Sequence, residues 1–144
     1  LEGAKEGAKS TFGIIPALVG LITAVSMLKA SGALDMFTAF IAPLAEKIGL
    51  PPQVVPLMLL RPVSGSGSLA LVDQIFSSSG VDSFAGRVAA VMMGSTETTF
   101  YAIAVYFGSV NIRKTRHTIP SALTADFTSV VIAVLTVRLL FGGG

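Results

Sequence analysis

The sequence contains no cysteine and only one histidine, His117, among its 144 residues. The first absence excludes disulfide bonds, thiolate nucleophiles and cysteine-based metal sites, and the second excludes a histidine-rich metal cluster. Charged residues make up 12% of the chain, about half of the roughly 25% that is usual in soluble domains. The net charge of +2 is too small to give the basic surface of a nucleic-acid-binding protein. We therefore expect no metal, no cofactor and no nucleic-acid partner.

The motifs of common enzyme families are missing as well. The chain contains no Gly-x-Ser-x-Gly, no His-Glu-x-x-His and no phosphate-binding loop. His117 lies beside the basic residues Arg113, Lys114 and Arg116, where we expect it to be solvated rather than catalytic. The sequence therefore predicts a protein that is not an enzyme.

Apolar residues, by contrast, are abundant: they make up 52% of the chain and give a mean hydropathy of +0.79. They fall into five stretches, 12–29, 33–50, 53–77, 84–110 and 119–141. The first has no charge between Lys9 and Lys29, which is roughly enough chain to cross a 30 Å hydrocarbon core. A signal peptide would explain only this stretch, and a soluble bundle would need polar outer faces. The prediction is an all-α, polytopic protein of the cell membrane, with about five hydrophobic segments in contact with the lipid bilayer.

Basic residues predict the orientation of these segments. Arg113, Lys114 and Arg116 crowd the short loop before the last stretch, and such loops stay in the cytoplasm. If all five stretches cross, counting back the four that precede this loop places the N-terminus, with Lys5 and Lys9, on the same side. The second stretch has charged ends and also suits a re-entrant or interfacial helix, so both arrangements stay open.

Two of the stretches contain polar interruptions. The third carries Arg61-Pro62 followed by Ser-Gly-Ser-Gly-Ser at 64–68, and the fourth carries Gly-Ser-Thr-Glu-Thr-Thr at 94–99. Both lie equally far along the chain from a turn at 79–83, so antiparallel helices would bring them to one depth, about 20 Å from that turn. Broken helices at the bilayer midplane mark substrate sites in secondary transporters. The alternative is close helix packing through small residues.

Glu97 bears on the choice between these alternatives. A carboxylate near the centre of a membrane helix costs about 2.5–3.5 kcal/mol to insert, so it should face a cavity or a partner. We expect Arg61 and Asp126 to lie at similar depths and to form a structural ion pair that leaves Glu97 free. An ion pair of Glu97 itself stays the alternative. The residues expected to bind a small polar solute offer hydroxyl groups and one carboxylate: Ser64, Ser66, Ser68, Ser95, Thr96, Glu97 and Thr98.

Several strings of this sequence resemble the spore maturation protein B family. They run from Arg61 to Gly67, from Asp82 to Arg87, from Gly94 to Tyr101, from Val105 to Gly108 and from Arg113 to His117. The family belongs to the nucleoside-recognition, or gate, membrane domains. The resemblance therefore implies one gate-type domain over residues 1–144, normally preceded by one more hydrophobic segment that this sequence lacks.

The resemblance also implies a site. In related nucleoside transporters a Gly-Gln-Thr-Glu motif on a re-entrant hairpin contacts the nucleoside. Gly94, Thr96 and Glu97 match this motif, and Ser95 stands where the glutamine would be.

The function implied by the resemblance is membrane transport of a small polar solute, nucleoside-like or other, linked to spore maturation and dehydration of the spore core. The alternative is a non-transporting membrane scaffold subunit of a spore-maturation complex. Five segments do not make the even, two-repeat body that is typical of transporters. We therefore expect a homo-oligomer or a spore maturation protein A-like partner.

Overall fold

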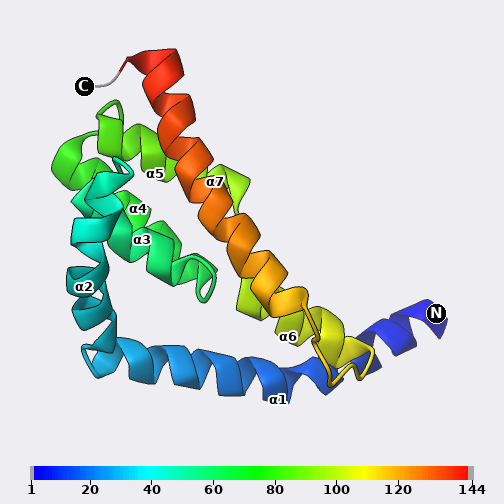
Figure 1. Cartoon of the computed structure of the whole chain (residues 1–144). Helices are drawn as coiled ribbons and strands as arrows, with labels where there is room; N and C mark the ends of the chain where they lie inside the picture. Colours follow the sequence, from blue (N-terminus) through cyan, green and yellow to red (C-terminus); the bar gives the residue numbers. More distant parts are fainter. Residues whose placement is uncertain (1, 143–144) are drawn as a thin grey trace.

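The computed structural model describes residues 2–142, so that residues 1, 143 and 144 of the predicted domain lie outside the described range. Within that range the chain is helical and has no strand, which confirms the all-α prediction. The elements are α1 (Glu2–Ala30), α2 (Ala33–Lys47), the 3-10 helix η1 (Pro52–Val54), α3 (Val55–Leu60), α4 (Gly65–Ser79), α5 (Phe84–Ser95), α6 (Thr99–Ser109) and α7 (Thr118–Phe141) (Figure 1).

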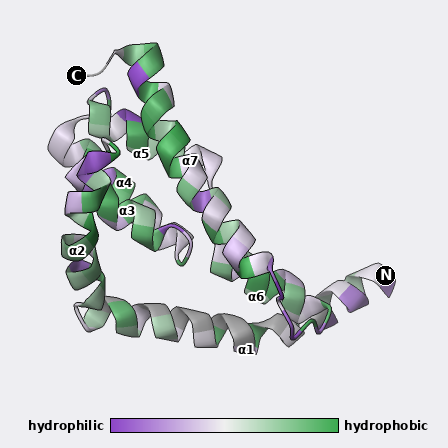
Figure 2. Ribbon diagram, in the orientation of Figure 1, coloured by the Kyte–Doolittle hydropathy of each residue, from purple (hydrophilic) through white to green (hydrophobic). Residues whose placement is uncertain are grey.

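Two stretches of the described chain are long and apolar enough to cross a membrane. They are Phe84–Ser109, which spans α5 and α6, and Thr118–Phe141, which is α7. They correspond to the fourth and fifth of the predicted hydrophobic segments. Hydrophobic residues predominate along α7, whereas hydrophilic ones gather in the loop before it and near the N-terminus (Figure 2). This pattern is consistent with a helical membrane protein.

Helices α1 and α2 meet at a sharp bend. Gly32 adopts a φ of 71°, a left-handed conformation that glycine reaches without steric cost, and it separates the two helices. From this bend α1 runs along α6, while α2 packs its far end against α3 (Figure 1). Several large apolar side chains on these two helices are exposed, among them Phe12, Phe37 and Phe40.

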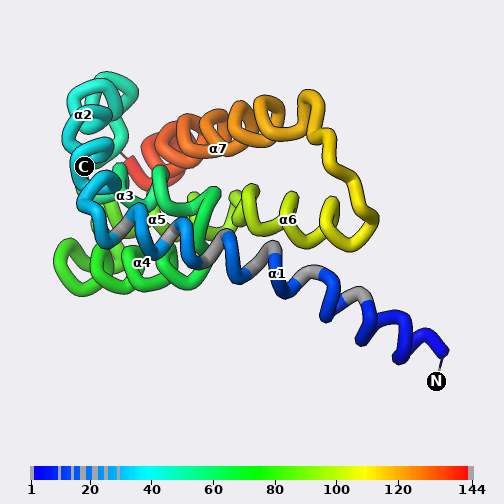
Figure 3. Tube along the Cα trace, turned by 90° about the horizontal axis from the view of Figure 1, so that it is seen from below, coloured from blue at the N-terminus to red at the C-terminus, as the bar shows by residue number. Residues whose placement is uncertain are grey.

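The chain reverses direction at residues 61–64. Arg61, just after α3, hydrogen-bonds to Thr96 at the end of α5, and Gly65, at the start of α4, lies against Thr98. Because residues 80–83 join the end of α4 to the start of α5, α4 must run antiparallel to α5. Helices α3 and α4 contact each other on the two sides of this reversal, so together they form a short hairpin (Figures 1 and 3).

This hairpin differs from the predicted arrangement, in which residues 53–77 form one crossing segment that is interrupted at 61–68. Pro62 has no N–H group to continue the helical hydrogen bonds, and Ser64 takes an extended conformation with φ −143° and ψ 111°. The Ser64 hydroxyl then accepts the N–H of Gly67 at 3.1 Å and so caps the start of α4. The residues that were expected to interrupt one helix therefore end one helix and begin another.

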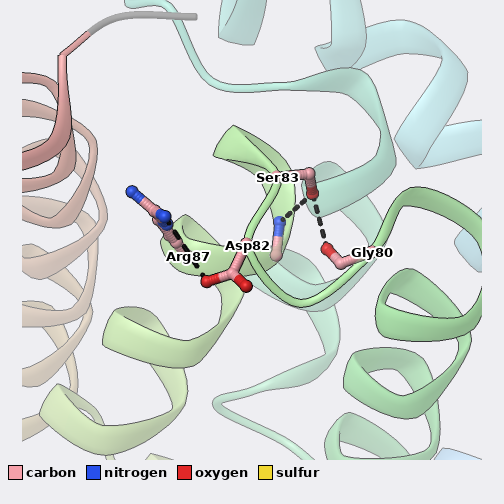
Figure 4. A network of polar contacts seen from close by, with 5 residues as sticks. Gly80, Asp82, Ser83 and Arg87 are labelled. Carbon is pink, nitrogen blue, oxygen red and sulfur yellow. Dashed lines mark hydrogen bonds and ion pairs between the residues drawn. The ribbon is translucent and has the colours of Figure 1, made fainter.

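The turn between α4 and α5 is closed by Ser83 (Figure 4). Its hydroxyl donates to the Gly80 carbonyl at 2.7 Å and accepts the N–H of Gly86 at 3.0 Å, which caps α5. Arg87 and Asp82 form an ion pair at 3.4 Å on the surface beside this turn. Gly86 packs against the turn so closely that an added Cβ would meet the carbonyl oxygens of Gly80 and Val81.

Helix α5 lies at the centre of the core. Its buried face, with Val88, Ala89 and Met92, packs against Val134 and Val137 in the second half of α7. The hairpin supplies the other side of the same cluster through buried residues of η1 and α3: Val54, Val55 and Leu57. This packing fixes the end of α5 relative to both α3 and α7, where the candidate site lies.

Candidate functional site

The buried residue Arg61 connects the hairpin tip to the end of α5. Its side chain is 7% exposed, and all its hydrogen bonds go to residues 93–98. Nε donates to the Thr96 hydroxyl at 3.0 Å, and Nη1 donates to the Thr98 hydroxyl at 3.3 Å. Nη2 donates to the carbonyl oxygens of Met93, at 3.3 Å, and Thr96. A cation is favourable here because the last carbonyl groups of a helix carry partial negative charge.

The backbone joins the same two regions. The N–H of Phe100 donates to the Pro62 carbonyl at 2.8 Å. At Gly65 an added Cβ would lie 3.2 Å from the Thr98 hydroxyl, so the start of α4 lies close to the segment between α5 and α6. The C-terminal ends of α3 and α5 and the N-terminal ends of α4 and α6 therefore meet at one place, which we call the helix junction (residues 61–65 and 96–100).

Thr96 ends α5 through both its backbone and its side chain. It adopts an extended conformation, with φ −123° and ψ 159°, which cannot continue the helix. Its hydroxyl donates to the Met92 carbonyl at 2.6 Å while it accepts the Arg61 guanidinium. The interruption between α5 and α6 is thus held in place by the hydroxyl groups that the sequence provides there.

Asp126 of α7 approaches the junction from the other side. Its Oδ2 accepts the hydroxyl of Thr99, the first residue of α6, at 2.6 Å. A carboxylate near this end of α6 is favourable because the free N–H groups there carry partial positive charge.

The predicted ion pair between Arg61 and Asp126 is absent from the part of the chain that the structure describes. Each residue binds threonines of the junction instead: Arg61 binds Thr96 and Thr98, and Asp126 binds Thr99. The sequence-based prediction placed both residues at a similar level, but it did not allow for the junction between them. The ion-pair prediction is therefore wrong, although both side chains border the same cavity.

This cavity has a volume of about 280 Å³ and lies between the junction and α7. Three of the residues that line it are polar, namely Arg61, Thr96 and Asp126. The others are apolar: Met58, Leu59, Pro62, Val63, Met92, Phe100, Leu123, Phe127 and Val130. The cavity is thus a mainly apolar space with one positive and one negative charge on its wall.

The structure divides the predicted site residues between two sides of the junction. Thr96 and Thr98 are buried and bind Arg61, whereas Ser66, Ser95 and Glu97 are exposed. Oε2 of Glu97 accepts only the N–H of the adjacent Thr98 within the described chain, at 3.3 Å. Ser64 caps α4, and the buried Ser68 donates to the Ser64 carbonyl at 2.6 Å. Of the predicted solute-binding residues, only Thr96 lines the cavity.

Sequence reasoning singled out Asp126 but missed the apolar residues of α7 beside it and the contact with Thr99. Leu123, Phe127 and Val130 line the cavity at a spacing of four and three residues, and Asp126 falls within the same stripe. This is the spacing of one helix face, and a carboxylate on such a face was a signal that could have identified them.

Comparisons with known proteins agree with the sequence pattern. Residues 11–113 match the family described as Gate, nucleoside recognition. The chain is 45% identical over 142 residues to spore maturation protein B of Bacillus subtilis (strain 168), an alignment that covers 99% of this chain and 80% of that protein. No solved structure matches the chain. The chain belongs to the spore maturation protein B family, a membrane and non-enzymatic family with a gate domain. Helix α7 and its Asp126 lie beyond the residues that match the gate family.

Proposed function

We propose that the chain is the solute-recognising subunit of a membrane transport system and that the solute binds at the helix junction. The observation that carries this proposal is the buried Arg61, which joins the hairpin tip to the interrupted α5–α6 stretch beside a cavity. Two helix N-termini and two helix C-termini point at this place. Transporters bind solutes and ions at such points, because the helix ends offer free N–H and C=O groups.

The length of the α5–α6 stretch supports a junction deep in the bilayer. Phe84–Ser109 is long enough to cross a membrane, and its interruption at 96–98 lies halfway along it. Backbone that is not helical is tolerated at this depth only where protein buries it or water reaches it. In our proposal α5–α6 and α7 cross the membrane, and the α3–α4 hairpin enters and leaves on the side of the 80–83 turn.

The exposed side of the junction carries the remaining predicted residues. No other part of the described chain covers these residues, which are Ser66, Ser95 and Glu97. At the bilayer midplane a carboxylate cannot face lipid without cost, so this side must meet water, a solute or another subunit. We propose that a second copy of the chain, or a spore maturation protein A-like partner, completes the solute site here.

The description of the matched family makes nucleosides the first solutes to test. The experiment is uridine uptake into vesicles that contain the purified protein, with the same variants tested for restoring spore heat resistance in a Bacillus subtilis strain that lacks its spore maturation protein B. Glu97→Gln keeps the shape of the side chain and removes its charge. We expect it to abolish both activities while membrane levels stay normal. Glu46→Gln, on the exposed surface of α2, is the matched control and should leave both unchanged.

The second candidate function is that of a scaffold subunit that transports nothing. One observation favours it: Glu97 is exposed and lies outside the cavity. A scaffold should tolerate the loss of this charge. If the Glu97→Gln variant restores heat resistance fully, and neither this variant nor the unchanged protein takes up uridine, the scaffold function replaces the transport function.

A further inference from the structure

Asp126, on the cavity wall, keeps one carboxylate oxygen that the protein itself does not use. Oδ2 of Asp126 binds the Thr99 hydroxyl, but Oδ1 has no hydrogen-bond partner among the described residues. Within the described chain no fully enclosed side-chain polar atom lacks a partner, so Oδ1 must be accessible. Because Asp126 lines the cavity, this oxygen is the candidate acceptor for a bound molecule.

Arg61, the other charged residue on the cavity wall, is already occupied. Its guanidinium uses Nε, Nη1 and Nη2 in four hydrogen bonds to residues 93–98. A guanidinium has five N–H groups, so at most one is left for a solute. Arg61 therefore acts as a positioning residue for the junction, and Asp126 is the group that can contact a bound molecule.

The charges on the wall select the charge of that molecule. Arg61 and Asp126 together contribute no net charge to a cavity whose other residues are almost all apolar. A cation or an anion would add an uncompensated charge to this space, which is costly where water is excluded. A neutral group with an N–H or O–H can instead donate to Oδ1 of Asp126, and such a bond to a charged acceptor is strong.

The lining and the volume of the cavity favour a small flat molecule. Phe100 comes from α6 and Phe127 from α7, and two flexible methionines, Met58 and Met92, complete the apolar surface. Aromatic rings and methionine sulfur both pack well against a flat ring. The volume of about 280 Å³ is at the low end for ligand sites, so it suits one small ring system.

We propose that the part of the solute that enters this cavity is a neutral, flat, largely apolar group that donates one hydrogen bond to Asp126. The proposal rests on the proposed function for the place where solute binds, and it adds the chemical class and the residue that selects it. The selecting residue lies on α7, beyond the part of the chain that matches the gate family.

The test uses four probes that share one ring system: indole, N-methylindole, tryptamine and indole-3-acetate. Indole fluorescence reports binding with no tryptophan signal from the chain itself, because the chain contains no tryptophan. Binding to the full chain in phosphatidylcholine nanodiscs is measured against empty nanodiscs, which corrects for partition into lipid. We expect indole to bind at least 10-fold more tightly than N-methylindole, which lacks the donor, and than either charged probe.

Asp126→Leu removes the acceptor, and it should reduce indole binding to the level of N-methylindole. Asp73→Leu, on the exposed face of α4, is the matched control and should bind as the unchanged protein does. If Asp126→Leu fails to fold, Phe127→Ala serves instead, since Phe127 is 55% exposed and its loss should weaken all neutral probes equally. Equal binding of indole and N-methylindole, or no binding beyond empty nanodiscs, would overturn the proposal and leave a lipid chain as the occupant.

Failure of this proposal can be told apart from failure of the transport function. If uridine uptake is present and depends on Glu97, but indole binds the Asp126→Leu variant as tightly as the unchanged protein, only the assignment of Asp126 is wrong. If indole binds through Asp126 but no uptake is observed, the cavity is a binding site in a protein that does not transport.

Discussion

Replacing Arg61 by lysine keeps the positive charge and removes the planar group that joins the two sides of the junction. The guanidinium reaches two hydroxyl groups and two carbonyl groups at once, over residues 93–98. An ammonium group is a compact charge that donates from one point, so it cannot reach all four acceptors. We expect Arg61→Lys to separate the hairpin tip from the end of α5.

The magnitude follows from the bonds that are lost. Hydrogen bonds to a charged group contribute about 1.5–3 kcal/mol each, and lysine should lose at least two of the four. The site is only 7% exposed, so water does not replace them. We therefore expect a loss of about 3 kcal/mol or more in the free energy of unfolding, which corresponds to roughly 10 °C in Tm for a chain of this size.

The assay is thermal unfolding in mild detergent, followed by circular dichroism at 222 nm, because the described chain is helical. Arg87→Lys is the matched control. Arg87 and Asp82 have side chains that are 31% and 94% exposed and lie 3.4 Å apart, and exposed pairs of this kind contribute about 0–1 kcal/mol. If the two substitutions lower Tm equally, Arg61 does not hold the junction together.

Three further predictions concern packing, orientation and assembly. Gly86→Ala should destabilise the protein by more than about 1 kcal/mol, because the added Cβ would meet backbone oxygens. Gly94→Ala, whose added Cβ would meet nothing within 4 Å, should not, and thermal unfolding of both variants checks this. Cysteine labels at Ser79 and Lys114 should react from opposite sides of the membrane, with Lys114 cytoplasmic, because α5–α6 lies between them; labelling of both from one side would exclude a crossing. The protein should form a defined oligomer in mild detergent, and a monomer that still takes up uridine would contradict a shared site.

The meeting of the two polar interruptions could be foreseen from the sequence. They lie equally far from the 79–83 turn, so any antiparallel arrangement of the helices on its two sides brings them together. The structure places Gly65 against Thr98 in this way. The reversal at Pro62 was not foreseen, because proline can either bend a helix or end it. Whether the helix bends or ends at Pro62 depends on contacts across the junction, namely those of the Arg61 guanidinium and of the Pro62 carbonyl. These contacts are visible only in three dimensions.

The hydrogen-bond partners of Arg61 and Asp126 could not be inferred from their depth in the membrane alone. Arg61 and Asp126 were expected to pair because opposite charges in an apolar environment attract. In the structure Arg61 hydrogen-bonds to Thr96 at 3.0 Å and Asp126 to Thr99 at 2.6 Å, and the helix ends add partial charges that favour each residue in its place. The sequence shows where the helices are interrupted but not that the chain reverses at 61–64, so the helix ends that meet at the junction could not be assigned as partners of these charges.

The position of α7 links the two proposals. Its second half, through Val134 and Val137, is fixed against α5, whereas its first half carries Asp126 and Phe127 along the cavity. Val130, one helical turn after Asp126, belongs to both the core and the cavity wall, so α7 connects the two directly. Solute that binds Oδ1 of Asp126 and the junction together would favour one position of α7, and a ligand can shift such an equilibrium only through this difference in contacts. In our proposals, Asp126 is therefore the residue through which binding at the junction would be coupled to the position of α7.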